Sequence, residues 1–341
     1  MSEVVRAALR KVVGGGSLSQ AEALAAMGEV MDGLATPAQL AGLLLALRMR
    51  TETVDELAGF ALAMRERVVR VVAPEGAIDS CGTGGDGSGT FNISTASALV
   101  VAAAGLPVAK HGNRAVTSAS GSADVLEALG IPIDHGPEEA ASALARDGFV
   151  FMFAPAYHPA MKHAGPVRRE LGVTTAFNLL GPMTNPAGVR RQVIGVADPL
   201  AAQRVAQVLF TLGVERAMVV HGDGVDELPL DGSGVAYDVS IEGVSQRRVD
   251  SVELGLPSAS TDELRGGDAA ENARVIEDVL GGERGPRRDV VLLNAGAALL
   301  VGGRVGQLRD GVEMAAAAID GGGARSLLSR LRESRVASTA A

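Results

Sequence analysis

The chain has 341 residues, of which 47% are hydrophobic and 21% charged, and its formal net charge is −9. This balance indicates a globular protein long enough for two domains, and the acidic excess disfavours nonspecific binding to nucleic acid or to an anionic membrane. The single cysteine, Cys81, excludes an internal disulfide and a zinc cluster of thiolates. The charged start of the chain does not resemble a signal peptide, and the apolar runs are too short to span a bilayer. We therefore expect a cytoplasmic protein whose partners include neither nucleic acid nor a membrane.

The first seventy residues are predicted to be helical, because capping boxes mark three helix starts. Each box places a hydroxyl residue three positions before Glu or Gln. The three boxes are Ser19 with Glu22, Thr36 with Gln39, and Thr53 with Glu56. Apolar residues follow at helical spacing, so we expect a small all-helical N-terminal domain over residues 1–73.

After Pro74 the pattern changes to short aliphatic runs separated by helical stretches. Helices of crossover length lie between several runs, for example Pro199–Leu212 behind an Asp198 cap, as parallel strands require. The sequence therefore predicts a large, mostly parallel α/β domain over residues 74–341. The predicted strands are Ala77–Cys81, Leu106–Lys110, Phe149–Phe153, Gln192–Val196, Ala217–His221 and Asp289–Leu293.

A glycine-rich run, Cys81–Thr90, follows the first predicted strand and precedes a helix that begins near Ser94 and Thr95. Glycines allow backbone N–H groups to surround an anion, and the helix N-terminus adds a positive dipole. So many glycines are costly unless something approaches the backbone, and we interpret Gly84 and Gly85 in that way. A merely flexible loop is the alternative.

The same run satisfies the glycine spacing of a dinucleotide-binding fold, but its second requirement fails. That fold needs an acidic residue about twenty positions further on to hold the ribose. Here no Asp or Glu occurs between Asp86 and Asp124. A Walker A loop is excluded as well, because no Gly-Lys-Ser/Thr follows.

A cationic run, Lys110–Arg114, ends the second predicted strand within this acid-free stretch. Ligands of open α/β sheets lie beyond the carboxyl ends of the strands, so this run and the glycine-rich run are predicted to face one crevice. Cations and hydroxyls without nearby acids suit a polyphosphate, although a solvated surface loop is the alternative. The hydroxyl residues are Thr117, Ser118, Ser120 and Ser122, and a helix is predicted to begin near Ser122.

A second acid-poor region extends from residue 148 to 197, with Glu170 as its only carboxylate. If Tyr157–Arg168 is one helix, Arg168 shares a face with small and apolar residues, and His158 lies above them. A cation beside such a surface suits an aromatic carboxylate. The alternative is that His158 is structural.

The third signal is the pair Asp226-Glu227, shortly after the predicted strand that ends at His221. Carboxylate oxygens are ligands that Mg²⁺ prefers, and this ion is usually shared with substrate phosphates. An exposed acidic turn is the alternative, but the two anion-binding runs favour a magnesium site.

Taken together, these motifs resemble the anthranilate phosphoribosyltransferases, in order over nearly the whole chain. The resemblance implies a nucleoside phosphorylase/phosphoribosyltransferase-like fold and a homodimer whose small domain also recruits part of residues 157–186, with a hinge between the domains. It implies transfer of the 5-phosphoribosyl group from phosphoribosyl pyrophosphate (PRPP) to the amine of anthranilate, in tryptophan biosynthesis. The motifs are Gly82–Asp86, Asn92–Thr95, Lys110–Arg114, Ser120–Gly130 and Phe177–Pro182.

The resemblance also assigns site residues, none of them a side-chain nucleophile. Those for PRPP are Gly82, Gly84, Gly85, Asp86, Thr90, Asn92, Ser94, Thr95, Lys110 and Ser122. Those for anthranilate are Gly82, His111, Asn113, His158 and Arg168, and those for Mg²⁺ are Ser94, Asp226 and Glu227. One departure stands out: the family usually has Arg-Thr where this chain has Thr174-Thr175, so a charge is missing near the hinge.

Two other functions are open at this point. A pyrimidine nucleoside phosphorylase has a similar architecture but resembles Lys-His-Ser-Thr-Gly where this chain has Lys110–Arg114. A non-enzymatic, nucleic-acid-binding relative of the same fold is disfavoured by the acidic balance.

Overall fold

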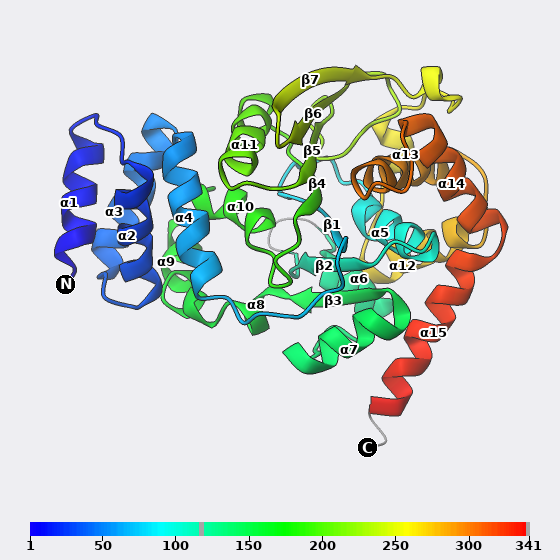
Figure 1. Cartoon of the computed structure of the whole chain (residues 1–341), viewed down its shortest axis with the longest axis horizontal. Coiled ribbons are helices and arrows are strands. Elements are labelled where there is room, and N and C mark those ends of the chain that lie inside the picture. The colour runs from blue at the N-terminus through cyan, green and yellow to red at the C-terminus, as the bar shows by residue number, and fades with distance from the viewer. Residues whose placement is uncertain (116–118, 339–341) are drawn as a thin grey trace.

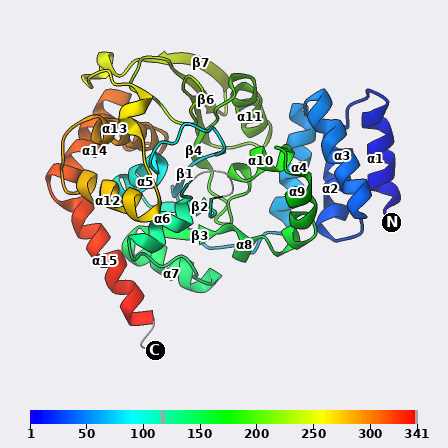
Figure 2. The same ribbon diagram turned by 180° about the vertical axis from the view of Figure 1, so that it is seen from behind.

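The computed structural model describes residues 1–115 and 119–338 and consists of a helical bundle beside a sheet that carries helices on both faces (Figure 1). The N-terminus lies in the bundle, and the last helix ends on the opposite side of the molecule (Figure 1 and Figure 2). The predicted hydroxyls of Thr117 and Ser118 fall outside the described residues.

Three of the four N-terminal helices begin where the capping boxes predicted, and α1 precedes them. In all three boxes the hydroxyl accepts a hydrogen bond from the backbone three residues on, and the Glu or Gln side chain returns one. The helices are α1 (Glu3–Val13), α2 (Gln20–Met31), α3 (Pro37–Arg50) and α4 (Val54–Glu66).

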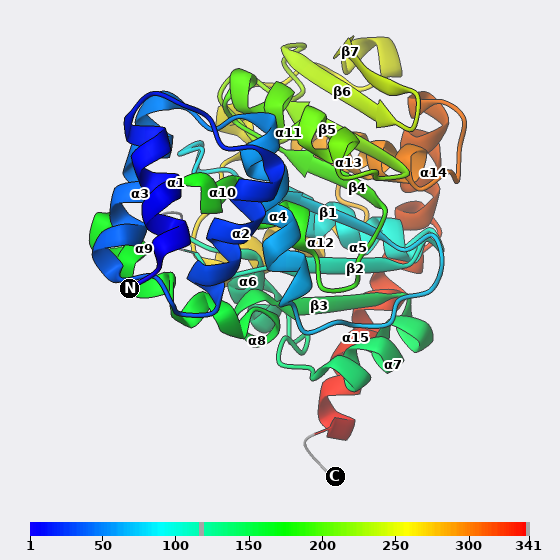
Figure 3. The same ribbon diagram turned by 60° about the vertical axis from the view of Figure 1, so that its left-hand side comes forward.

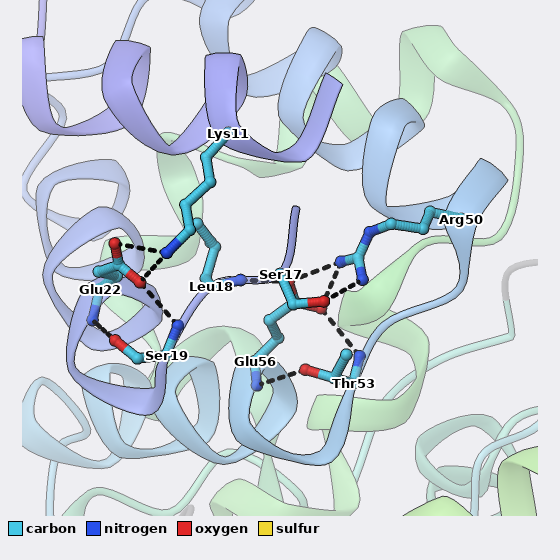
Figure 4. Close-up of polar contacts among 8 residues, drawn as sticks. All are labelled: Lys11, Ser17, Leu18, Ser19, Glu22, Arg50, Thr53 and Glu56. Atoms are coloured by element: carbon cyan, nitrogen blue, oxygen red, sulfur yellow. Dashed lines mark hydrogen bonds and ion pairs between the residues drawn. The ribbon is translucent and has the colours of Figure 1, made fainter. Parts of the chain in front are cut away.

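A buried carboxylate ties these helices together (Figure 4). Glu56 has no exposed surface, and its oxygens accept hydrogen bonds from the backbone N–H groups of Leu18 and Thr53, both at 2.8 Å. The Arg50 guanidinium donates to both oxygens at 2.6 Å. A buried charge is tolerated only when it is paired and hydrogen-bonded, and Glu56 meets that condition. The bundle therefore has a fixed arrangement of α2, α3 and α4.

The sheet has seven strands in the order β3-β2-β1-β4-β5-β6-β7, which Figure 3 shows from bottom to top. Strands β1 to β5 pair in parallel, and β6 and β7 add an antiparallel edge. The mostly parallel α/β domain predicted from the sequence is thus confirmed. The strands are β1 (Ile78–Gly82), β2 (Val108–Gly112), β3 (Phe149–Phe153), β4 (Arg191–Gly195), β5 (Arg216–His221), β6 (Gly234–Ser240) and β7 (Gly243–Val249).

The sixth predicted strand, Asp289–Leu293, is wrong. These residues lie inside α13 (Pro286–Val301), a helix that is almost entirely buried. Periodicity cannot separate a buried strand from a buried helix, and Pro286 at the first helical position was the usable signal. The hairpin of β6 and β7 was not predicted at all.

Helices cover both faces of the sheet. On one face, Ile78, Phe149 and Phe151 share a core with six helices, and on the other α7 (Pro137–Asp147) and α11 (Pro199–Thr211) pack against alternate strand residues. Burial on both faces explains why β3, with the sequence FVFMF, is apolar at every position. The six helices are α5 (Ile93–Ala103), α6 (Ser122–Ala128), α12 (Ala269–Leu280), α13, α14 (Leu308–Asp320) and α15 (Gly323–Ser338).

The segment between β3 and β4 is broken into short helices, so the single helix expected over Tyr157–Arg168 is not formed. Pro159 and Pro166 each start a new piece, because proline cannot continue the hydrogen bonding of a preceding turn. Residues of this segment, including Val167 and Phe177, share a core with α1 to α4. The pieces are α8 (Ala154–Tyr157), η1 (Pro159–Lys162), α9 (Gly165–Leu171), α10 (Ala176–Leu180) and η2 (Pro182–Thr184).

The strand order places a reversal of the chain path between β1 and β4. Strands β2 and β3 lie on one side of β1, and the chain then crosses back to place β4 on the other side. In open α/β sheets, the crevice beyond the carboxyl ends at such a point is where ligands bind. The ends of β1 and β4 are therefore where a ligand is expected to bind.

Candidate active site

Two glycines end the strands at this point, Gly82 in β1 and Gly195 in β4, and they are register neighbours. A Cβ at Gly82 would overlap the Asp226 carboxylate, and a Cβ at Gly195 would overlap the Asp226 backbone carbonyl. Glycine at both positions thus allows the acidic turn after β5 to lie directly over the strand ends. This turn, Asp226-Glu227, was predicted as the metal-binding pair.

The glycine-rich loop meets the same turn, because the Gly84 backbone N–H donates to the Asp226 carboxylate at 2.7 Å. Gly84 and Gly85 have φ values of 68° and 74°. The backbone conformation therefore requires glycine at both positions, and the interpretation that they also allow a ligand to approach stays a prediction. An added Cβ at Gly84 would meet nothing within 4 Å, so the loop is open on that side. Further along, the Thr90 hydroxyl lies 3.2 Å from that of Ser88.

Carboxylates crowd this corner and perturb one another. Burial, followed by the charge of Asp86, raises the pKa of Asp226 to about 6. Burial and the charge of Asp226 raise the pKa of Glu227, against the opposing effect of Lys110 and the Ser94 backbone N–H. One carboxylate oxygen of Asp86 is buried without a hydrogen-bond partner among the described residues. Crowded hard oxygens with an unsatisfied acceptor fit a divalent cation.

The start of α5 lies beside these carboxylates. The Lys110 ammonium is buried, donates to the Ser80 carbonyl at 2.5 Å and lies 3.4 Å from the Ser94 hydroxyl. Lys110 therefore reaches the first turn of α5, next to the glycine-rich loop, as the sequence predicted. Thr95 is only 1% exposed, and its hydroxyl has no partner among the described residues.

The side chain of Asn92 is committed to the protein on both of its polar atoms. Its amide nitrogen donates to the Ser120 carbonyl at 3.2 Å, and its amide oxygen accepts from Asn272 of α12 at 2.9 Å. The Asn272 oxygen accepts in turn from the Gly267 N–H at 2.8 Å. The start of α5 is thereby anchored to two distant segments. Asn272 was missed because a lone polar residue in an amphipathic helix gives no sequence signal.

Part of the cationic run is not free for an anion, which corrects the expectation that no acids lie nearby. Arg114 forms ion pairs with Asp124 at 2.9 Å and with Glu127, both on α6. Asp124 and Glu127 follow the acid-free stretch in the sequence, but α6 places them against Arg114. Asn113 is exposed, and its carbonyl accepts from the Ser122 hydroxyl at 3.3 Å.

His111 and His158 form a buried pair, with ring centroids 5.0 Å apart. Burial lowers the pKa of His111 to about 3, with a further contribution from His158, and burial lowers the pKa of His158 to about 4. Both rings are therefore neutral near pH 7. The Nε2 atom of each has no partner among the described residues, so each can contact a ligand.

Asp79 of β1 is a buried carboxylate that contacts the backbone of His111 and was not predicted as a site residue. It accepts from the His111 backbone N–H at 3.3 Å and from the Asn185 amide at 2.7 Å. Burial raises its pKa. An aspartate inside a predicted apolar strand was the available signal, because buried acids need specific partners.

Arg168 lies on α9 with its guanidinium 5.1 Å from the Phe177 ring centroid. Partial burial lowers its pKa, and no hydrogen bond or ion pair of its guanidinium is found within residues 1–115 and 119–338. A partly buried cation against an aromatic ring suits an aromatic carboxylate. Thr174, where the family usually has arginine, is exposed.

Across the described residues, no group of three or more His, Cys, Asp or Glu side chains forms a complete metal cage, and no helix is long and apolar enough to cross a membrane. A cation at Asp226 and Glu227 would therefore need further oxygen ligands from substrate or water.

Comparisons with known proteins match both parts of the chain. The family model described as "Glycosyl transferase family, a/b domain" matches residues 74–325, and that described as "Glycosyl transferase family, helical bundle domain" matches residues 6–68. An anthranilate phosphoribosyltransferase of Symbiobacterium thermophilum is 54% identical over 331 residues, which cover 96% of this chain and 97% of that protein.

Solved structures agree with the sequence comparison. The crystal structure of anthranilate phosphoribosyltransferase from Thermus thermophilus has a TM-score of 0.90 and 44% identity, covering 96% of this chain and 98% of that one. The enzyme from Saccharomyces cerevisiae in complex with PRPP and Mg has a TM-score of 0.87 and 26% identity, covering 98% and 99% of the two chains.

Proposed function

Because this chain belongs to the anthranilate phosphoribosyltransferase family, we propose that it transfers the 5-phosphoribosyl group of PRPP to the amine of anthranilate. The products are N-(5-phosphoribosyl)anthranilate and pyrophosphate, in tryptophan biosynthesis. The observation that carries the proposal is the contact of the acidic turn with the glycine-rich loop at the point where the sheet reverses its path. The nucleoside phosphorylase and nucleic-acid-binding alternatives have no comparable support.

The proposed PRPP subsite is the loop after β1 together with the start of α5. Backbone N–H groups of the glycines, the α5 dipole and the Lys110 ammonium bind and orient the pyrophosphate. Asp226, Glu227 and Ser94 would hold Mg²⁺, which when bound neutralises the charge that develops on the leaving pyrophosphate. Because Lys110 is buried, its attraction for the phosphates is little screened by water.

The residues proposed to form the anthranilate subsite are Gly82, His111, Asn113, His158 and Arg168. The two neutral histidines offer unpartnered nitrogen atoms, and Arg168 offers a cation for the carboxylate. The amine attacks C1 of the ribose as pyrophosphate leaves, through a transition state with oxocarbenium character. Orientation of both substrates and electrostatic stabilisation supply the catalysis, so no nucleophilic side chain is required.

The proposal extends to assembly and location. Residues 1–73 with part of 157–186 form the small domain, which closes by a hinge on residues 74–341, and the chain forms a homodimer in the cytoplasm. Support for the small domain comes from the shared core of α1 to α4 with α9 and α10.

The experiment that tests the function is a fluorescence assay. Adding PRPP and Mg²⁺ to the protein and anthranilate should deplete anthranilate fluorescence, and omitting either should prevent the loss. A protein that leaves anthranilate unchanged but cleaves pyrimidine nucleosides with phosphate, or binds DNA in a salt-dependent way, would overturn the proposal.

A further inference from the structure

Asn294 is a buried amide in the middle of α13, a helix that is otherwise almost wholly apolar at its buried positions. It is 2% exposed, and asparagine is a poor residue for a helix interior. An aliphatic residue would fill this position without the cost of burying an amide. Its presence therefore points to the hydrogen bonds that it makes.

Those hydrogen bonds go mainly to one residue, Leu228. The Asn294 amide oxygen accepts from the Leu228 backbone N–H at 3.0 Å, and the amide nitrogen donates to the Leu228 carbonyl at 2.9 Å. The nitrogen also donates to the Val290 carbonyl at 2.9 Å within the helix. Both donors and the acceptor of the side chain are thus used.

Leu228 directly follows the acidic pair, so its N–H belongs to the same peptide group as the Glu227 carbonyl. On the other side of the pair, the Gly222 N–H donates to the Val225 carbonyl at 3.0 Å and closes a turn. Asp226 and Glu227 are therefore held between a closed turn and the Asn294 amide. The two peptide groups that flank the pair are Val225–Asp226 and Glu227–Leu228. Rotation of either group would move the carboxylates of Asp226 and Glu227 away from the glycine-rich loop and Lys110.

We infer that Asn294 is a positioning residue for the acidic turn, which it holds through Leu228 so that Asp226 and Glu227 can bind the metal–pyrophosphate. The inference rests on the proposed function. It differs from a purely structural role, in which Asn294 would only satisfy buried backbone groups. Residues that orient metal ligands without touching the metal typically contribute 10- to 100-fold to metal affinity.

The test compares Asn294→Leu and Asn294→Ala with a matched control, Ser251→Ala. Ser251 is buried and donates to the Leu230 carbonyl at 2.9 Å, only two residues beyond Leu228. The control therefore removes a buried hydrogen bond from the same segment without releasing the acidic pair. The measurements are the melting temperature and the binding of Mn²⁺ in the presence of pyrophosphate, followed by the electron paramagnetic resonance of free Mn²⁺.

Both Asn294 variants should weaken Mn²⁺ binding about 10- to 100-fold, whereas Ser251→Ala should lower the melting temperature and leave Mn²⁺ binding unchanged. If Asn294→Leu does not fold, Asn294→Ala carries the comparison. Wild-type affinity in a folded Asn294 variant, or equal weakening in the Ser251 control, would overturn the inference. A wild-type protein that binds Mn²⁺ with pyrophosphate but transfers no phosphoribosyl group would overturn the proposed function alone, and the Mn²⁺ comparison would still decide the role of Asn294.

Discussion

The rings of His111 and His158 lie 5.0 Å apart at an interplanar angle of 44°, although one residue belongs to a strand and the other follows the neighbouring strand. His111 is the second-last residue of β2, and His158 follows the short helix α8 after β3, the strand next to β2. Adjacent parallel strands thus bring together two imidazoles, of residues 111 and 158, that are 47 positions apart in the sequence. Their burial as neutral rings has a consequence for stability.

Acidification should destabilise the protein through this pair. The folded-state pKa values, about 3 for His111 and about 4 for His158, lie below the ordinary value of 6.5. The unfolded chain therefore binds protons more readily as the pH falls below about 6.5, and each histidine costs the fold on the order of 1 kcal/mol per pH unit down to about 4. Melting temperatures measured from pH 7.5 to 5 should fall, and His111→Gln should flatten the slope. The exposed His163, changed to Gln, is the control and should keep the wild-type slope. Parallel slopes for wild type and His111→Gln would contradict the prediction.

Arg168→Ala should raise the KM for anthranilate much more than that for PRPP. A hydrogen bond to a charged group contributes about 1.5–3 kcal/mol, so the increase should be roughly 10- to 100-fold. The exposed neighbour Arg169 on the same helix, changed to Ala, should leave both constants near wild type. Equal increases of both constants in Arg168→Ala would mean that the arginine has a structural role through Phe177.

Gly82→Ala should displace the acidic turn. The φ of Gly82 is not in the left-handed region, so the backbone tolerates alanine, but the new Cβ would overlap the Asp226 carboxylate. Overpacking of this kind costs about 1–3 kcal/mol, and the Mg²⁺ concentration for half-maximal activity should rise. Gly306→Ala is the control, because Gly306 is exposed and has open space around it. An unchanged Mg²⁺ dependence in Gly82→Ala would show that the turn does not need this contact.

Local signals in the sequence predicted much of the fold. The capping box of Thr53 and Glu56 does not depend on the tertiary fold, because both of its hydrogen bonds join residues three positions apart. The run Phe149–Phe153 is apolar enough to be a strand buried on both faces, and its boundaries were predicted correctly. Val290–Leu293 is also apolar throughout, so periodicity alone did not distinguish this part of a buried helix from a strand.

The site was predictable where one loop carries the chemistry and unpredictable where distant residues meet. The glycine-rich loop and Lys110 could be placed together from the rule that ligands lie beyond strand ends. The pairing of Arg114 with α6 depends on how that helix packs against the strand end, and no local pattern predicts it. The amides Asn272 and Asn294 act across about 180 and 66 positions, a separation at which no spacing rule operates.

Asn272→Ala should weaken the binding of PRPP and leave the binding of anthranilate unchanged. The substitution leaves the Asn92 oxygen and the Gly267 N–H without partners, and each unsatisfied group costs about 1–3 kcal/mol when buried. Asn92 precedes α5, so its release should loosen the glycine-rich loop and the first turn of that helix. The KM for PRPP should rise several-fold, and the KM for anthranilate should stay near wild type.

The expected loss of PRPP binding in Asn272→Ala must be distinguished from a general loss of stability, and Ser97→Ala is the control variant. Ser97 is buried on the same helix, and its hydroxyl donates to the Val291 carbonyl at 3.3 Å, away from the loop. Ser97→Ala should therefore lower the melting temperature but keep the wild-type KM for PRPP. The thermal shift produced by PRPP plus Mg²⁺ gives a second measure, because a ligand stabilises in proportion to its binding. That shift should shrink in Asn272→Ala and persist in Ser97→Ala. If the two variants lose stability and PRPP affinity in the same proportion, Asn272 merely supports the fold and does not orient the loop.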